Sequence, residues 1–397
     1  MAIIVGSGKR LTTDDGIPYM WQSGDVTTPP SNEIKIMSSD GGAYDYFGDA
    51  IAVGSGKVVA GSWSIDIGSN NFQGAVYIYD LDGTNEVKIT ASDGAADDYF
   101  GFRVGAGCGK IVVGARGDNS EQGSVYIYDL NGNNEVKITA SDGVASDRFG
   151  YSVGVGCGKI VVGTQYANSA YIYDLDGTNE VKITASDSIP SDRFGSSVAV
   201  GSGKIVVGAD NDDDNGNNSG SVYIYDLDGS NKVKITASDG APLNYFGHSV
   251  AVGSGRIVVG TLSSEKAYIF DLDGNEVGII TASDGPWENN ASSGGGGYFG
   301  QTVAAGNGRI VVGARLAGIN TIGKAYVYDL EGNQLGIVTA SVSADPNDNF
   351  GHRVAVGCGK ILINARSDTD NAWEGGSAYI YDTPPVYNLY DAIDLNY

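Results

Sequence analysis

The dipeptide Phe-Gly recurs seven times in this chain of 397 residues, and its even spacing constrains the fold more than any other feature. The shortest interval is 45 residues, from Phe149 to Phe194, and the longest is 53 residues, as from Phe47 to Phe100. A repeat of this length is typical of solenoids and propellers. The seven dipeptides are Phe47-Gly48, Phe100-Gly101, Phe149-Gly150, Phe194-Gly195, Phe246-Gly247, Phe299-Gly300 and Phe350-Gly351.

Each repeat contains four segments with strand patterns, as the unit beginning at Phe100 shows. Its Ile-Val-Val run (residues 110–114) lacks polar alternates, as expected for a strand buried on both faces. Its last segment, Glu-Val-Lys-Ile-Thr (residues 135–139), alternates apolar and polar residues, which indicates an outer strand with one wet face. Asn-Gly and Asp-Gly pairs supply hairpin turns. Four-stranded antiparallel units of this length predict the blades of a β-propeller.

The two ends of the chain predict that the propeller is closed. The seventh unit lacks a fourth strand, because its third strand (residues 378–381) runs into Pro384 and Pro385. The missing pattern stands near the start, where residues 33–37 match residues 135–139. A ring closed in this way leaves no bare sheet edge. We therefore predict an all-β protein with one seven-bladed β-propeller (32–383), its last blade completed by an N-terminal strand, an N-terminal arm (1–31) and a C-terminal tail (384–397).

The charge balance excludes some partners. The chain has 24 basic and 48 acidic residues, a formal net charge of −24. Nucleic-acid binding depends on Lys and Arg, so we expect no nucleic-acid partner. No apolar run approaches the roughly 18 residues of a membrane span, and the start does not resemble a secretory signal, so we expect no membrane insertion. Three cysteines, Cys108, Cys157 and Cys358, all stand in Gly-Cys-Gly-Lys and are interpreted as small turn residues.

The repeat resembles the FG-GAP repeat family, which includes the propeller of integrin α-subunits. Phe-Gly at each unit start and Val-Val-Gly-Ala at 112–115, 206–209 and 311–314 carry the resemblance. It implies a propeller fold. Many repeats of that family have an Asp-rich calcium loop between these two motifs, but here the connection is only Gly-Ser-Gly-Lys, as at residues 54–57. Too few carboxylates remain there for a six- to eight-oxygen calcium site, so we expect no cofactor.

Other candidate sites are weak. Asp210, Asp212 and Asp214 have the density of a calcium loop, but an EF-hand register places Val222 where the bidentate Glu belongs, so we favour a solvated loop. Arg116-Gly117-Asp118 spells a tripeptide that integrins recognise, and we interpret it as a coincidence.

The two histidines do not indicate a metal or a catalytic site. His248 and His352 each follow a Phe-Gly directly, and no other blade has a histidine there. The equivalent positions hold Asp49, Phe102, Tyr151, Ser196 and Gln301. No metal-ligand pattern or catalytic constellation is therefore shared around the ring, and we predict that the protein is not an enzyme.

One face of the predicted ring carries variable loops. Four large aromatic residues lie in these loops, at Trp63, Phe72, Trp287 and Trp373. Variable loops on a rigid scaffold are where recognition usually resides, and exposed aromatic rings are typical contact anchors. We interpret these four residues as a partner- or glycan-binding site. The alternative is that the rings cover the core at the bases of the loops.

These features favour a non-enzymatic structural and adhesive protein. We expect a phage virion component, such as a tail fibre or capsid appendage, that displays the propeller for host or glycan recognition. The terminal arms would dock on other structural proteins, and the receptor would be a cell-surface glycan or protein. The alternative is a bacterial surface or secreted FG-GAP lectin-like adhesion protein, located outside the cell.

Overall fold

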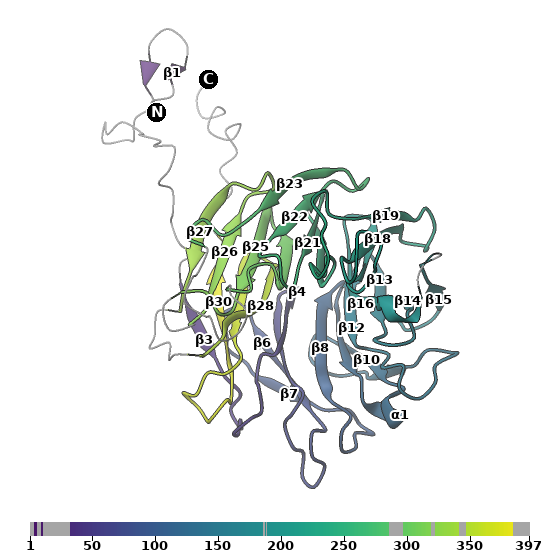
Figure 1. The fold of residues 1–397 in the computed structure, drawn as a ribbon. Helices are drawn as coiled ribbons and strands as arrows, with labels where there is room; N and C mark the ends of the chain where they lie inside the picture. The colour runs from purple at the N-terminus through teal and green to yellow at the C-terminus, as the bar shows by residue number, and fades with distance from the viewer. Residues whose placement is uncertain are drawn as a thin grey trace, which may run out of the picture.

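A computed structural model describes residues 4–5, 9–10, 32–185, 187, 189–285, 297–318, 322–340 and 347–383. Seven sheets, each of four antiparallel strands, follow one another around a ring (Figure 1), and a separate pair joins β1 (Ile4–Val5) to β2 (Lys9–Arg10). Helix within the described residues is limited to two short segments, α1 (Asp118–Glu121) and η1 (Pro190–Asp192). The predicted seven-bladed β-propeller is confirmed, and the predicted arm and tail lie almost wholly outside the described residues.

Within each blade the chain moves outward from the strand nearest the ring axis. The first four blades are β4 (Ala50–Gly54), β5 (Lys57–Ser62), β6 (Ala75–Asp80), β7 (Val87–Ile89); β8 (Phe100–Gly107), β9 (Lys110–Ala115), β10 (Ser124–Asp129), β11 (Val136–Ile138); β12 (Ser152–Gly156), β13 (Lys159–Gly163), β14 (Ala170–Asp174), β15 (Val181–Ile183); and β16 (Phe194–Gly201), β17 (Lys204–Ala209), β18 (Ser221–Asp226), β19 (Val233–Ile235). The last three are β20 (Ser249–Gly253), β21 (Arg256–Gly260), β22 (Ala267–Phe270), β23 (Glu276–Ile280); β24 (Thr302–Gly306), β25 (Arg309–Ala314), β26 (Lys324–Tyr328), β27 (Gln334–Val338); and β28 (Phe350–Gly357), β29 (Lys360–Ala365), β30 (Ser377–Asp382), β3 (Ile34–Ile36).

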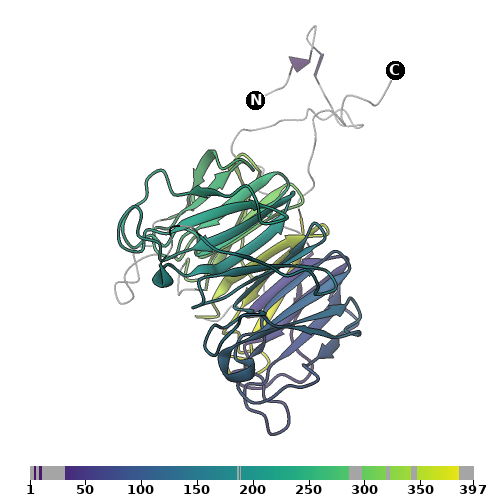
Figure 2. The ribbon, with the colours of Figure 1, turned by 90° about the vertical axis from the view of Figure 1, so that its right-hand side faces the viewer.

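The blade that begins and ends the chain is joined as the sequence predicted. The strand β3 pairs with β30 in antiparallel register, with Ile34 opposite Ile380 and Ile36 opposite Ala378. In Figure 1 the purple β3 lies against the yellow strands of the last blade. Seen from the side, the strands of all blades run between two faces from which the loops emerge (Figure 2). The ring therefore has no gap between its last and first blades.

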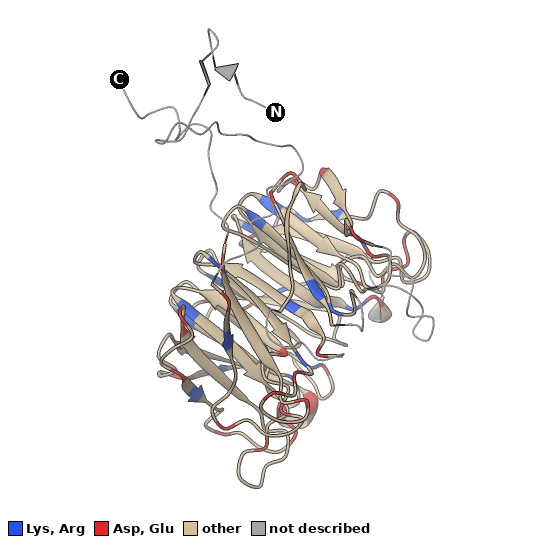
Figure 3. Cartoon of the chain, turned by 90° about the vertical axis from the view of Figure 1, so that its left-hand side faces the viewer, with Lys and Arg blue, Asp and Glu red and all other residues tan. Residues whose placement is uncertain are grey.

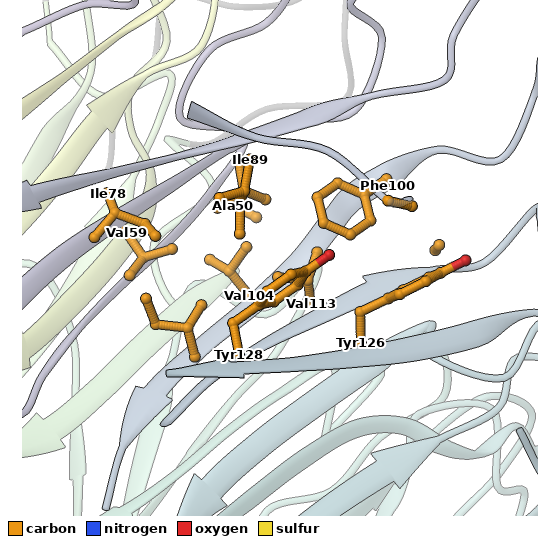
Figure 4. Close-up of a cluster of buried hydrophobic side chains, with 13 residues drawn as sticks. Ala50, Val59, Ile78, Ile89, Phe100, Val104, Val113, Tyr126 and Tyr128 are labelled. Atoms are coloured by element: carbon orange, nitrogen blue, oxygen red, sulfur yellow. The ribbon is translucent and has the colours of Figure 1, made fainter. Parts of the chain in front are cut away.

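The phenylalanine of each Phe-Gly is a core residue. All seven are fully buried, and Phe100 shows the common arrangement. Its ring meets the rings of Tyr126 and Tyr128 edge-on, with centroids 5.4 and 6.2 Å apart. It belongs to a cluster with Ile78 and Ile89 of the preceding blade (Figure 4). The alternating Tyr residues of the third strand thus pack against Phe within their own blade, and the aliphatic residues of the neighbour complete the layer between blades.

Glycine is required where backbones of neighbouring blades meet. Gly101 has φ +88, and a Cβ at this position would lie 2.6 Å from the carbonyl oxygen of Ala75. A Cβ on Gly54 would lie 2.0 Å from the carbonyl oxygen of Ala106 in the next blade. Only glycine allows the left-handed backbone at the first site and the close approach at the second.

At six blade junctions a carboxylate fastens the following blade. Asp93, which follows the outer strand β7, accepts a hydrogen bond from the hydroxyl of Tyr126 at 2.8 Å and from Lys137 Nζ at 2.7 Å. Five further junctions repeat this latch. In the fifth and sixth blades the lysine stands just before or at the start of the third strand instead of in the fourth. These are Asp40 with Tyr77 and Lys88, Asp142 with Tyr171 and Lys182, Asp187 with Tyr223 and Lys234, Asp239 with Tyr268 and Lys266, and Asp284 with Tyr326 and Lys324.

The three cysteines occupy hairpin turns, as predicted. Each has a positive φ and an exposed free thiol. The thiol of Cys157 accepts a hydrogen bond from the backbone N–H of Gly203 at 3.5 Å, and the thiol of Cys358 accepts one from the backbone N–H of Gly56. Where the turn carries serine, Ser202 Oγ accepts from Gly255 at 3.1 Å. These residues therefore link the turns of neighbouring blades.

Candidate binding site at the mouth of the ring

The two faces of the ring differ in the length of their connections. On one face the first and second strands of every blade are joined by a two-residue hairpin, such as 55–56 between β4 and β5. We call this the turn face. On the opposite face the connections between second and third strands vary in length, from the short connection of residues 164–169 to the long connection of residues 63–74. The Phe-Gly dipeptides also lie on this face, where the chain enters the innermost strands. We call this the loop face, and the residues that surround its centre form the mouth of the ring.

Asp49 organises one side of the mouth. It follows Phe47-Gly48 and is nearly buried. The indole N–H of Trp63 donates a hydrogen bond to its Oδ2 at 2.6 Å, while His352 Nδ1 and Arg366 Nε lie 3.3 and 3.2 Å from its Oδ1. Burial would raise the pKa of Asp49, but His352 and the guanidinium groups of Arg353 and Arg366 lower it to about 2. The carboxylate is therefore ionised and joins the first blade to the seventh.

A row of aromatic rings leads outward from this carboxylate. Trp63 stacks on Tyr46 with centroids 5.8 Å apart and meets Tyr99 edge-on at 5.6 Å. Tyr99 in turn stacks on Phe72 at 6.3 Å. Trp63 is half-buried, whereas 43% of Phe72 is exposed. Two of the four predicted aromatic residues are thus brought together, and Trp63 fits the alternative in which a ring covers the base of a loop.

The other two predicted aromatic residues are not joined to this row. Trp373 lies in the loop between β29 and β30, and 64% of its side chain is exposed. Among the described residues it makes no ring-to-ring contact. Trp287 lies outside the described residues. Binding by any of the four stays a prediction.

Guanidinium groups lie over the faces of these rings. The guanidinium carbon of Arg366 is 4.2 Å from the ring centroid of Tyr46. That of Arg116 is 4.2 Å from Phe102 and 4.7 Å from Tyr99. Cation–π contact of this kind suits arginine, whose planar group stacks on an aromatic face while its N–H donors remain free at the edge.

Two more arginines stand beside Asp49 at the start of innermost strands. Arg353 Nε donates a hydrogen bond to the backbone carbonyl oxygen of Asp49 at 3.2 Å. Arg103 Nη1 donates to the backbone carbonyl of Phe102 at 2.7 Å. Burial, together with the neighbouring guanidinium of Arg103, lowers the pKa of Arg353 to about 10. Burial also lowers the pKa of Arg103, so each charge is held in a place where it is partly desolvated.

Arg315 completes this set on the sixth blade. Its Nε donates a hydrogen bond to Gln301 Oε1 at 2.6 Å, and its guanidinium carbon lies 4.2 Å from the ring centroid of Tyr298. Burial lowers its pKa, and Arg366 and Arg353 lower it further. We call Arg103, Arg116, Arg315, Arg353 and Arg366 the arginine cluster. Among the described residues, Asp49 is the only acidic side chain that forms an ion pair with any of the five.

The acidic run of the fourth blade is only in part the solvated loop that we expected. Asp210 and Asp212 are only 3% and 2% exposed. His248 Nδ1 lies 3.0 Å from Asp210 Oδ2, and Lys234 Nζ lies 3.0 Å from Asp212 and 2.5 Å from Asp214. Asp210 and Asp212 thus lie inward against polar partners, whereas Asp214 near the tip of the loop is exposed. Within the described part of the chain, no group of three His, Cys, Asp or Glu residues is arranged to hold a metal ion.

The Arg116-Gly117-Asp118 tripeptide is not presented as an exposed motif. Arg116 packs on the rings of the mouth, whereas Asp118 is buried, accepts a hydrogen bond from Ser124 and lies 2.5 Å from Lys137 Nζ. Beside it a hollow of about 900 Å³ opens on the loop face. Its lining has five acidic residues, Asp93, Asp97, Asp98, Asp118 and Glu121, against one basic residue, Lys137. Tyr99 stands between this acidic hollow and the arginine cluster.

The fold defines a class: a closed seven-bladed β-propeller with a basic, aromatic mouth. The family model of the FG-GAP repeat matches residues 30–79, 84–128, 133–173, 178–225 and 230–270. The chain belongs to the FG-GAP repeat family. No curated protein matches the sequence. Among the described residues, no helix is both long and apolar enough to cross a membrane.

Several solved structures have a similar fold. A streptogramin B lyase is 10% identical with a TM-score of 0.61, and the match covers 89% of this chain and 98% of that one. Virginiamycin B lyase from Staphylococcus aureus is 10% identical with a TM-score of 0.58, over 89% and 99%. U3-55K is 7% identical with a TM-score of 0.61, over 89% and 100%. At these identities the likeness shows the fold alone, and a propeller fold does not determine whether a protein is an enzyme.

Proposed function

We propose that this protein is a non-enzymatic adhesive module that recognises its target with the loop face of the propeller. The observation that carries the proposal is the row of Trp63, Tyr99 and Phe72, which ends in an exposed ring on that face. The turn face offers two-residue hairpins, which are linked to one another by Ser and Cys side chains, and the short connections between third and fourth strands, such as residues 81–86. Variable loops on a rigid ring favour recognition over scaffold formation alone.

The histidines of the mouth support the non-enzymatic part of the proposal. His248 and His352 each direct Nδ1 toward an aspartate. Among the described residues, neither side chain is hydrogen-bonded to a serine, threonine or cysteine that it could activate as a nucleophile. Burial and the adjacent guanidinium of Arg353 lower the pKa of His352 to about 3, so its imidazole is neutral near pH 7 and is not poised for proton transfer there.

We place the protein in a phage virion, as a tail fibre or capsid appendage that meets the host surface. Residues 1–31 and 384–397 would then dock on other structural proteins of the particle. A lectin-like adhesion protein on a bacterial surface is the second candidate, because the same loop face would serve it equally well. Mass spectrometry of purified particles and of cell envelopes distinguishes the two: the protein is expected in the particles, and recovery from virus-free envelopes would favour the second.

The role of the loop face is tested by adhesion of the labelled protein to intact host cells. We expect Phe72→Ala and Trp373→Ala to weaken adhesion, because both remove exposed rings from the loop face. Val136→Ala is the matched control, since Val136 is 40% exposed but lies on the outer strand β11. Adhesion that both aromatic variants leave unchanged would refute the proposed function.

A further inference from the structure

The arginine cluster is an unbalanced positive site in a strongly acidic protein. The chain carries a net charge of −24, yet among the described residues only one of the five guanidinium groups at the mouth, that of Arg366, is paired with a carboxylate. Arg116 has no ion pair among the described residues, and its buried Nε has no hydrogen-bond partner. Arg366 Nε lies near Asp49 but without the alignment of a hydrogen bond. Within the described part of the chain, two buried guanidinium nitrogens of the mouth, Nε of Arg116 and Nε of Arg366, therefore lack a hydrogen-bond acceptor.

Holding these charges together destabilises the folded protein. Their presence therefore implies a purpose other than stability. Partial burial disfavours each charged form, and neighbouring like charges disfavour it further. Elsewhere among the described residues most basic side chains have an acidic partner, as Lys137 has in Asp93 and Arg148 has in Glu121. In the arginine cluster, over the same part of the chain, only Arg366 has one. An uncompensated guanidinium cluster is the arrangement that binds carboxylate, sulfate or phosphate groups.

The surroundings of the cluster limit the size of the anion. Glu121 pairs with Arg148, Glu374 accepts from the Tyr46 hydroxyl, and Asp97 lines the hollow beyond Tyr99. Figure 3 shows that acidic residues are spread along the loops at the ends of the blades. A long polyanion would meet this acidic surface and be repelled, whereas a single anionic group can reach the centre.

We propose that the arginine cluster binds one carboxylate or sulfate group at the end of an otherwise uncharged ligand, in the manner of a terminal acidic sugar. The inference rests on the proposed function, because it assigns a ligand class to the same loop face. Arg103, Arg116 and Arg353 receive the anionic group, and the adjoining Tyr99 and Phe72 rings offer apolar contact to the uncharged part. Arg366 supports the site by balancing Asp49.

Three sugars that differ in one group test the proposal by isothermal titration calorimetry. These are 3′-sialyllactose with one carboxylate, 3′-sulfolactose with one sulfate, and neutral lactose. We expect at least one acidic sugar to bind tenfold or more tightly than lactose, and the stronger of the two identifies the anionic group. If neither acidic sugar binds more tightly than lactose, the proposal is overturned.

Variants locate the binding. Arg116→Gln and Arg353→Gln are expected to weaken binding of the acidic sugar tenfold or more. Arg256→Gln is the matched control, because Arg256 lies on the turn face and donates to the carbonyl of Leu330. Thermal unfolding verifies that each variant is folded. Binding that survives both mouth substitutions would overturn the assignment.

The adhesion assay separates this inference from the proposed function. Loss of adhesion in Phe72→Ala, together with equal binding of acidic and neutral sugars, would retain the function and reject the anionic ligand. Tight binding of an acidic sugar, with adhesion unchanged in Phe72→Ala and Trp373→Ala, would retain the anion site and reject the adhesive role of the loop face.

Discussion

Ile34 lies directly opposite Ile380 in an antiparallel strand pair, although the two residues stand near opposite ends of the chain. This pairing places β3 at the outer edge of the seventh blade. The adjacent Ile36 is 5% exposed and shares a core cluster with Phe47 and Ala378. The ring therefore depends on contacts that form only when the start of the polypeptide reaches its last sheet.

Ile36→Asp tests this closure. An unpaired carboxylate in this core should lower the free energy of unfolding by about 3 kcal/mol or more. Ile89 holds the equivalent place in the first blade, so Ile89→Asp should lower the free energy of unfolding by a similar amount. Val136→Asp, at an exposed position of an outer strand, should change it little. Urea denaturation followed by circular dichroism measures the three values. A native-like midpoint for Ile36→Asp would mean that β3 does not seal the ring.

The junction latch is expected to act as a pairwise unit. Asp93→Ala removes the acceptor of Tyr126 and Lys137, and Tyr126→Phe removes only the hydroxyl donor. Because the lysine pair is partly exposed, most of the effect should come from the tyrosine, and we expect a coupling of about 1 kcal/mol in a double-mutant cycle. Asp82→Ala is the control, since Asp82 bonds only within its own hairpin to Thr84. Strictly additive losses would show that Asp93 and Tyr126 are not energetically coupled.

Stability should depend on pH through His352. Its pKa falls from 6.5 to about 3 on folding, because burial and Arg353 disfavour the charged form more than Asp49 favours it. Between these values the unfolded chain binds a proton that the folded chain does not, so stability falls as the pH falls from about 6.5 toward 3. Between pH 7.5 and pH 5 the titration of this residue should lower the free energy of unfolding by about 2 kcal/mol.

Comparison with His352→Gln isolates that contribution, because the carboxylates titrate in both proteins. We expect the loss of unfolding free energy between pH 7.5 and pH 5, measured in urea, to be smaller in the variant by about 2 kcal/mol. Equal losses in the two proteins would show that His352 is free to take up a proton in the folded ring.

The fold could be predicted from sequence because its determinants are periodic. Phe100 and its six counterparts recur at one place in every unit, and residues 33–37 repeat the pattern of residues 135–139. The polar latch was not predicted. Asp93 belongs to the sequence Ala-Ser-Asp-Gly (residues 91–94), which recurs in other repeats, but its partners Tyr126 and Lys137 belong to the next blade, and only the three-dimensional junction brings them together.

The mouth was predicted only in part, because its residues differ from blade to blade. Trp63 was identified as an aromatic loop residue, but its hydrogen bond to Asp49 and its contact with Tyr99 connect separate blades. The arginine cluster was missed. A signal was present in the choice of basic residue: Arg103 and Arg353 stand two residues after Gly101 and Gly351, whereas the outer strands carry lysine.

The most direct test of the account is the position of a bound anion. Crystals soaked in selenate, a sulfate analogue with a strong anomalous signal, would reveal where an oxyanion binds. We predict the strongest selenium peak within hydrogen-bonding distance of the guanidinium groups of Arg116 and Arg353, and its absence from crystals of Arg353→Gln. Selenium peaks that lie elsewhere on the ring, with none at the mouth, would contradict the account.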